Sequence, residues 1–207
     1  MKLIFFPDVH NNPWFEKILK AIKTIKEAKA ISLGDIAAVE TKKFLKNKVK
    51  YHTTWKYKKG KQVINISDVD IDWFDRLNIE GWNKQIGILD KNKINLTVCM
   101  GNSDYAIINW YKEKIKLSDR LKIVDNISIF IFDNIAFIFW PYNSGLIDEK
   151  HIKKLKESKL EKICALSHCP PMKNSNKDYY KQIYANLNIL KKMFKEVLLI
   201  HGHMHPK

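Results

Sequence analysis

The sequence predicts an α/β fold in a single domain, and three observations lead to this expectation. The 207 residues have the length of one ordinary globular domain with room for a small insertion. Hydrophobic residues make up 45% of the chain and charged residues 29%, a balance that supports a buried core and is not typical of disorder. Short apolar runs alternate with segments of helical periodicity along the chain.

The N-terminal segment has the order strand, helix, strand. Residues 2–6 form an apolar run that Pro7 ends, and residues 30–33 form a second run. Between them, a helix is predicted to begin at Pro13 and Trp14, and its apolar positions share one face: Phe15, Ile18, Leu19, Ile22 and Ile25. This order predicts a parallel strand pair with a right-handed crossover. A third strand is predicted over residues 96–100.

The second half of the chain continues the alternation and adds one antiparallel element. Residues 127–132 and 135–140 are rich in β-formers and flank Asp133-Asn134, which favours a hairpin. The remaining predicted elements are a helix over about 148–157, a strand over 163–167, a helix over 179–194 and a strand over 197–200. This half therefore repeats the order strand, helix, strand.

Residues 41–79 fit the alternation poorly, and we interpret them as a small basic insertion or cap. Residues 41–61 contain nine lysines, no acid and four aromatic residues. One interpretation is a surface that binds single-stranded nucleic acid. We favour a solvated lysine-rich face, because the chain has only two arginines, Arg76 and Arg120, and lysine lacks the planar fork that grips a phosphate.

Composition also limits the class of partner and the compartment. Lysine and arginine number 37 against 22 acids, a formal net charge of +15 that favours anionic partners. Three cysteines, Cys99, Cys164 and Cys169, are too few for a disulfide framework. No apolar stretch approaches the roughly 18 residues that span a bilayer. We therefore expect a cytoplasmic protein with no membrane partner, while its oligomeric state does not follow from the sequence.

Residue types that bind metal ions follow each predicted strand of the α/β pattern. Because ligands bind at the carboxyl ends of strands in open α/β sheets, these residues are expected to converge. They comprise two carboxylates, one amide and four imidazoles, enough for two adjacent divalent cations if one carboxylate bridges. Each short motif alone is common in turns, so the ordered set carries the prediction. The candidate ligands are Asp8, His10, Asp35, Asn102, His168, His203 and His205.

In this order, the motifs resemble those of the calcineurin-like metallophosphoesterases. The motifs are Asp8-Val9-His10, Gly34-Asp35, Gly101-Asn102, His168 and Gly202-His203-Met204-His205. The resemblance covers the chain except residues 41–79 and implies a four-layer αββα sandwich of the metallophosphoesterase type. It also implies that Asp8, His10 and His205 hold one metal ion, that Asn102, His168 and His203 hold the other, and that Asp35 bridges them.

The sequence departs from the family pattern at two places. Many members have a histidine after the Gly-Asn pair, where this chain has Ser103, a poor acid near neutral pH. With Asp104 after it, this feature resembles the small bacterial and archaeal phosphodiesterases of the superfamily. Only Pro206 and Lys207 follow His205, whereas family members usually continue with further strand. The sequence is thus expected to be that of a minimal or a truncated member.

The function implied by the resemblance is that of a dinuclear metal-dependent phosphodiesterase acting on a small or nucleotide-derived phosphoester. A hydroxide held between the two metal ions would attack phosphorus, and the residues assigned to catalysis are Asp35, Asn102 and His168. Ligands rich in imidazole favour manganese, with iron, zinc or nickel as alternatives. Two other functions stay open: a nuclease acting on single-stranded nucleic acid, and a non-catalytic scaffold, since the superfamily includes a retromer subunit.

Overall fold

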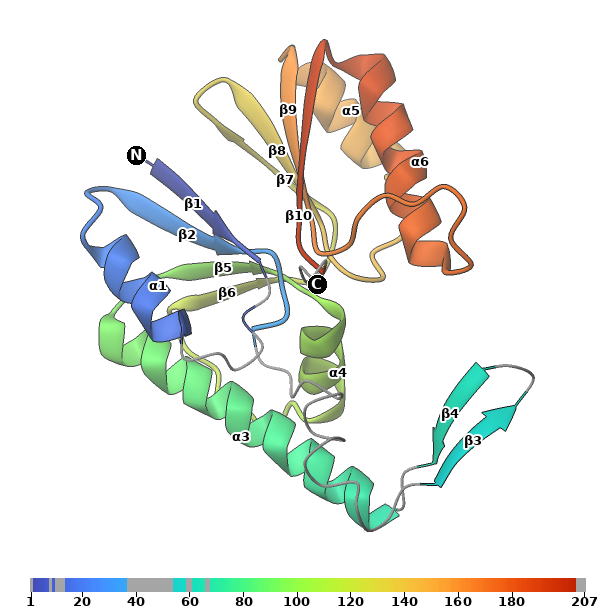
Figure 1. Cartoon of the computed structure of the whole chain (residues 1–207). Helices are drawn as coiled ribbons and strands as arrows, with labels where there is room; N and C mark the ends of the chain where they lie inside the picture. The colour runs from blue at the N-terminus through green and yellow to red at the C-terminus, as the bar shows by residue number, and fades with distance from the viewer. Residues whose placement is uncertain are drawn as a thin grey trace.

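The computed structural model describes residues 2–7, 9, 14–36, 54–58, 61–65 and 68–203. Within these residues the chain forms two four-stranded sheets, one two-stranded sheet and helices, so the α/β prediction is confirmed. The carboxyl ends of strands from both large sheets meet near the middle of the molecule (Figure 1).

The first large sheet is parallel throughout, as the order strand, helix, strand predicts. Its strands, in order across the sheet, are β1 (Lys2–Phe6), β2 (Ala28–Ser32), β5 (Leu96–Cys99) and β6 (Leu121–Val124). Helices α1 (Trp14–Lys23) and α3 (Asp68–Asn92) lie on one face of this sheet (Figure 1).

Apolar side chains of α1 and α3 form the core on this face. Phe15 and Leu19 of α1 meet Trp82 and Leu89 of α3 and the strand residue Val98 in one buried cluster. The two α1 residues lie four apart, the spacing that places side chains on one face of a helix. The apolar face read from the sequence is therefore the face that α1 buries.

The second large sheet contains three parallel strands and one antiparallel strand. Its strands, in order, are β10 (Glu196–His201), β9 (Lys162–Ser167), β8 (Ile135–Trp140) and β7 (Ser128–Phe132). The turn between β7 and β8 has positive φ angles of 50° at Asp133 and 58° at Asn134. These angles are typical of the tight turns that suit hairpin twist, so the predicted hairpin is confirmed.

Helices cover the outer face of the second sheet, and the two sheets share an apolar interface. Helices α5 (Glu149–Glu157) and α6 (Asp178–Met193) pack through Leu155 and Leu190 onto the second sheet. Leu33, Phe137 and Leu166 belong to a third buried cluster that joins residues of both sheets. The layers therefore follow the order helices, sheet, sheet, helices (Figure 1).

Several elements of the structure were not predicted. They are β6, α3, α4 (Asn102–Trp110) and the hairpin of β3 (Thr54–Lys58) with β4 (Lys61–Asn65), a second antiparallel pair. Helix α3 begins inside the predicted insertion and continues beyond residue 79. Its buried residues Trp82, Ile86 and Leu89 keep helical spacing, but Gly81 and Gly87 lower its intrinsic helix propensity, since glycine costs about 1 kcal/mol relative to alanine inside a helix.

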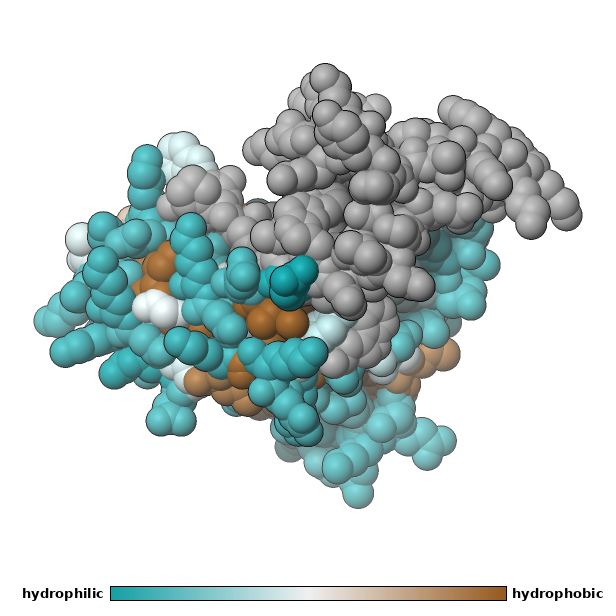
Figure 2. All heavy atoms as spheres, turned by 90° about the horizontal axis from the view of Figure 1, so that it is seen from below, coloured by the Kyte–Doolittle hydropathy of each residue, from teal (hydrophilic) through white to brown (hydrophobic). Residues whose placement is uncertain are grey.

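The surface of the described residues fits the polar composition. Among the described residues on the face in Figure 2, hydrophilic residues predominate, with smaller hydrophobic areas between them. Among the described residues, no helix has the length and apolar character needed to cross a membrane. The three cysteines, Cys99, Cys164 and Cys169, are free and buried.

Candidate metal centre

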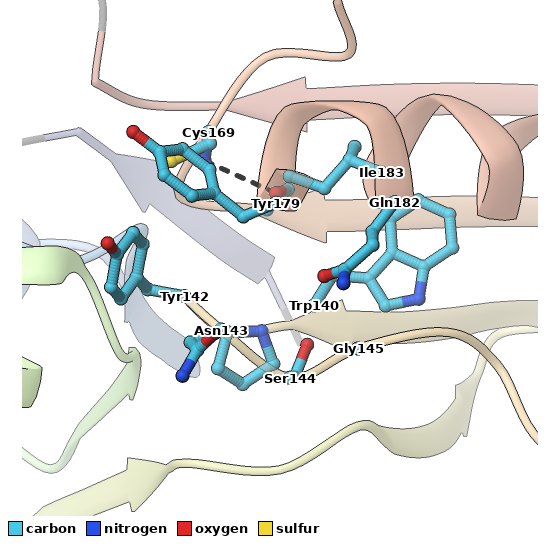
Figure 3. Close-up of a pocket in the computed structure, with 11 residues that line it drawn as sticks. Trp140, Tyr142, Asn143, Ser144, Gly145, Cys169, Tyr179, Gln182 and Ile183 are labelled. Atoms are coloured by element: carbon cyan, nitrogen blue, oxygen red, sulfur yellow. Dashed lines mark hydrogen bonds between the residues drawn. The ribbon is translucent and has the colours of Figure 1, made fainter. Parts of the chain in front are cut away.

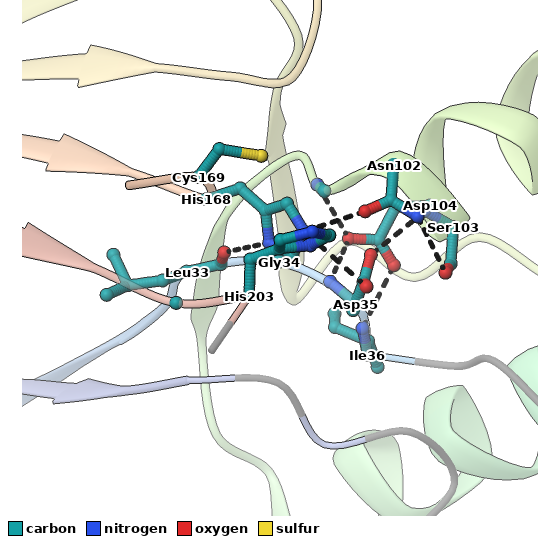
Figure 4. A network of polar contacts seen from close by, with 12 residues as sticks. Leu33, Gly34, Asp35, Ile36, Asn102, Ser103, Asp104, His168, Cys169 and His203 are labelled. Atoms are coloured by element: carbon teal, nitrogen blue, oxygen red, sulfur yellow. Dashed lines mark hydrogen bonds and ion pairs between the residues drawn. The ribbon is translucent and has the colours of Figure 1, made fainter. Parts of the chain in front are cut away.

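Four of the seven candidate ligands lie together at the carboxyl ends of β2, β5, β9 and β10 (Figure 4). The Nε2 atom of His168 is at the centre of this group. It lies 2.9 Å from Asn102 Oδ1, 3.0 Å from His203 Nδ1 and 3.5 Å from Asp35 Oδ2. These residues come from positions up to 168 apart in the sequence, and the convergence expected from the strand ends is observed for them.

The other three candidate ligands, Asp8, His10 and His205, lie outside the described residues. Their assignment stays a prediction. Two further histidines, which the sequence placed outside the site, have other partners. His151 contacts Asp148 Oδ1 through Nδ1 at 2.6 Å, and His201 Nδ1 lies 3.0 Å from the carbonyl oxygen of Gly202.

The surroundings of His168 determine which of its ring nitrogens carries hydrogen. Nδ1 lies 2.8 Å from the carbonyl oxygen of Leu33, which can only accept a hydrogen bond, so Nδ1 donates. In the neutral ring, Nε2 then presents a lone pair to the oxygens of Asn102 and Asp35. Histidines that bind metal ions typically donate their other N–H to a carbonyl or carboxylate in this way. His168 is therefore oriented as a metal ligand would be.

Asp35 is held in place by the first turn of α4. Its Oδ1 accepts a hydrogen bond of 2.9 Å from the backbone N–H of Ser103, and the residue is only 2% exposed. Free N–H groups and the helix dipole favour a carboxylate at this position. Asp35 has a φ of 49° and His203 a φ of 64°, values that non-glycine residues adopt at a cost. Strained backbone of this kind is found at functional sites.

Asp104 connects the loops that follow β2 and β5. Its carboxylate is fully buried and accepts hydrogen bonds from the N–H groups of Asp35 (2.7 Å), Ile36 (3.0 Å) and Gly101 (3.0 Å). Burial, followed by the nearby charge of Asp35, raises the pKa of Asp104 to about 7. Asp104 therefore fixes the backbone that carries Asp35. The sequence indicated only that Asp104 fits the family pattern, because its partners depend on two loops distant in the chain.

Two glycines let these loops approach each other. A Cβ added to Gly34 would lie 2.6 Å from the backbone nitrogen of Gly101, and the φ of Gly34 is +101°. A Cβ added to Gly101 would lie 2.3 Å from Asp35 Oδ1 and 2.9 Å from His168 Nδ1. Gly34 thus lets the two loop backbones lie close together, and Gly101 leaves the space that the side chains of Asp35 and His168 occupy.

The structure adds Cys169 to the residues near the centre. His168, Cys169 and His203 form a group that could hold a metal ion, with their candidate ligand atoms all within 4.8 Å of one another. Cys169 is buried, and thiolate sulfur is a soft ligand that suits zinc and iron. From the sequence, Cys169 is expected only to be a reduced cysteine. Its position directly after His168 in the sequence was the signal that could have identified it as a candidate ligand.

Comparison with known proteins does not add to the interpretation of these residues. The sequence matches no protein-family model, and it matches no curated protein. Four chains of solved structures match. In one crystal structure the match covers 99% of this chain and 84% of the other chain, at 12% sequence identity and a TM-score of 0.48. A similarity of this size carries no argument about the function.

Proposed function

We propose that this chain is a dinuclear metal-dependent phosphodiesterase of the metallophosphoesterase type. The observation that carries the proposal is the convergence of ligand atoms on Nε2 of His168. A carboxylate, an amide oxygen and a second imidazole lie within 3.5 Å of this nitrogen, which is a set of groups of the kind that binds a divalent cation. The order helices, sheet, sheet, helices is compatible with the sandwich of this family.

The donor set fits a metal ion chemically. Asn102, His168 and His203 would hold one metal ion, and Asp35 would bridge to a second ion held by Asp8, His10 and His205. The mixture of imidazole, amide and carboxylate suits manganese, and the nearby sulfur of Cys169 adds weight to the zinc alternative. When bound, the ions would act as Lewis acids and lower the pKa of a bound water toward about 7.

The residues of the chain supply orientation and substrate access. Ser103 N–H and Asp104 fix Asp35, while the Leu33 carbonyl fixes the ring of His168, so these ligands need little rearrangement when a substrate binds. Asn102, Ser103 and His203 are half-buried and form the accessible side of the centre. Since Ser103 is a poor acid near neutral pH, the leaving oxygen would take its proton from water.

Metal analysis combined with an aryl phosphodiester assay tests this proposal. The purified full chain is expected to bind about two divalent ions and to hydrolyse bis-p-nitrophenyl phosphate only when they are present. Asp35→Asn and His168→Ala are expected to abolish turnover, while Asp125→Asn, a change of an exposed carboxylate, should leave it unchanged. Wild-type turnover in the first two variants, or a metal-loaded chain that is inactive on every phosphoester, would contradict the proposal.

A substrate panel distinguishes the small-substrate phosphodiesterase from the nuclease. The panel compares a phosphomonoester, a cyclic nucleotide, a dinucleotide and a single-stranded oligonucleotide. The nine lysines of residues 41–61 are the observation that favours a nuclease. We expect preference for the small diesters. Preference for the oligonucleotide, with a steep salt dependence that neutralising Lys56, Lys58, Lys59 and Lys61 removes, would favour the nuclease instead.

A further inference from the structure

Four tyrosines form a continuous row beside the candidate metal centre. Tyr105 lies 5.9 Å from Tyr142, Tyr142 lies 4.9 Å from Tyr179, and Tyr179 lies 4.3 Å from Tyr180, measured between ring centroids. The row ends at the ring of His203, 5.9 Å from Tyr180. The tyrosines come from α4, from the loop after β8 and from the start of α6. Three separate parts of the chain therefore build one aromatic wall.

Both ends of the row connect to residues that form the centre. Tyr105 is in α4, the helix whose first turn holds Asp35 through Ser103 N–H. At the other end, Tyr180 contacts His203, whose Nδ1 is 3.0 Å from His168 Nε2. A ligand with a phosphate at the centre would thus have aromatic side chains directly beside it.

Packing within the core explains only part of this row. Tyr180 is buried, but Tyr105, Tyr142 and Tyr179 are half-buried and keep part of their surface in contact with solvent. Neighbouring rings meet at angles of 51° to 66°, so no two of them cover each other face to face. Aromatic surface is therefore left for a planar group, which tyrosine and tryptophan rings bind well.

A small cavity next to the row limits how such a group could bind. Figure 3 shows Tyr142 and Tyr179 on one side of this cavity, with Trp140 and Gln182 on the other. Its free volume is about 10 Å³, room for a single water molecule. A planar ring cannot enter it and would lie against the outward surface of the tyrosines. The ammonium of Lys177, 5.8 Å from the ring centroid of Tyr179, adds positive charge there.

We propose that this tyrosine row is the subsite for the base of a nucleotide, so that the substrate is a nucleoside phosphodiester. The proposal rests on the proposed phosphodiesterase function, since the phosphate is placed at the metal centre. Stacking of a base on an aromatic side chain contributes about 1–3 kcal/mol, which corresponds to about 5- to 150-fold in affinity. The row would therefore select nucleotides over phosphoesters that lack a ring.

Binding of two ligands that differ only by the base tests the subsite. Adenosine 5′-monophosphate and ribose 5-phosphate are titrated by calorimetry into the metal-loaded full chain. We expect the nucleotide to bind about tenfold more tightly. In the double variant Tyr142→Leu/Tyr179→Leu, this ratio should fall to within about twofold, whereas Tyr142→Phe/Tyr179→Phe should retain it because the rings remain. The metal content of both variants is measured in parallel and should be unchanged.

A control variant and the outcomes that would contradict the base subsite distinguish its failure from a failure of the proposed phosphodiesterase function. Tyr111 packs against the core of the first sheet, and Tyr111→Leu should retain the ratio. Equal affinities of the wild-type chain for the two ligands, or an unchanged ratio in the double leucine variant, would overturn the base subsite while leaving the phosphoesterase in place. If neither ligand binds the metal-loaded chain, the proposed function itself fails. The wild-type comparison decides the question even if the leucine variants do not fold.

Discussion

Replacement of Gly101 by alanine is a direct test of how the candidate centre is packed. The backbone of Gly101 has φ −87° and ψ 179°, an extended conformation that any residue adopts, so alanine causes no backbone strain. The added Cβ would lie 2.3 Å from Asp35 Oδ1 and 2.7 Å from the backbone nitrogen of Asp35. The first distance is about 1 Å shorter than ordinary van der Waals contact. The whole loss of stability expected for Gly101→Ala therefore comes from the contact of the added Cβ with Asp35.

The size of the expected destabilisation follows from which atoms must move to make room for the added Cβ. Asp35 is buried and cannot shift its carboxylate without losing the hydrogen bond from Ser103 N–H. Overpacking of a buried site costs about 1–3 kcal/mol, and loss of a hydrogen bond to a charged group costs about 1.5–3 kcal/mol. Gly101→Ala should thus lower the free energy of unfolding by about 3–5 kcal/mol. Displacement of Asp35 should also weaken metal binding about 10- to 100-fold.

Urea denaturation of the metal-free chain and calorimetric metal titration measure these two effects. Gly87→Ala is the matched control, since a Cβ at this position of α3 meets nothing within 4 Å. It should leave metal affinity unchanged and raise the free energy of unfolding by about 0.5–1 kcal/mol, the gain of alanine over glycine in a helix. A Gly101→Ala variant within 1 kcal/mol of the wild type, with unchanged metal affinity, would refute the described packing.

Three further predictions address the ligands, the leaving group and the fold. Metal at 100 times its Kd should raise the free energy of unfolding by about 2.7 kcal/mol. His168→Ala should remove most of this gain. An equal gain in the variant would exclude His168 as a ligand. Ser103→His should raise turnover of esters with poor leaving groups more than that of aryl esters, because protonated imidazole is an acid near neutral pH. Equal changes for the two kinds of ester would place residue 103 away from the leaving oxygen. Asn186→Leu should lower the free energy of unfolding, measured by urea denaturation, by about 2–4 kcal/mol, because it removes the hydrogen-bond partners of Ile147 N–H and the Gly145 carbonyl. A decrease below about 1 kcal/mol would contradict these buried hydrogen bonds.

The sequence could place Asp35, Asn102, His168 and His203 near one another because the strands before them are parallel. Parallel strands in one sheet end at the same edge, so residues after each strand converge whatever their distance along the chain. The two sheets also had to meet at the same edge for Asp35 and Asn102 to reach His168 and His203. That second step followed from the resemblance, and the structure brings these four residues together.

Other features depended on contacts that no local pattern encodes. Helix α3 was missed although Trp82, Ile86 and Leu89 have helical spacing, because its first half lies among the polar residues of the predicted insertion, and packing of these three residues against the first sheet stabilises the helix. Tyr142 follows the end of β8 and could have been found by the same strand-end argument as the ligands. Its neighbours Tyr105 and Tyr179 could not, since they belong to helices.

By itself, the sequence determined the alternation of strands and helices, the hairpin at Asp133-Asn134, and the residue types at the strand ends. These features are local, because side-chain periodicity and turn chemistry act over a few residues. Only the tertiary structure decided how Asp104 joins the loops of Asp35 and Gly101, which nitrogen of His168 faces the centre, and where the tyrosine row lies. Each of these depends on atoms that come close only when both sheets and their helices are packed together.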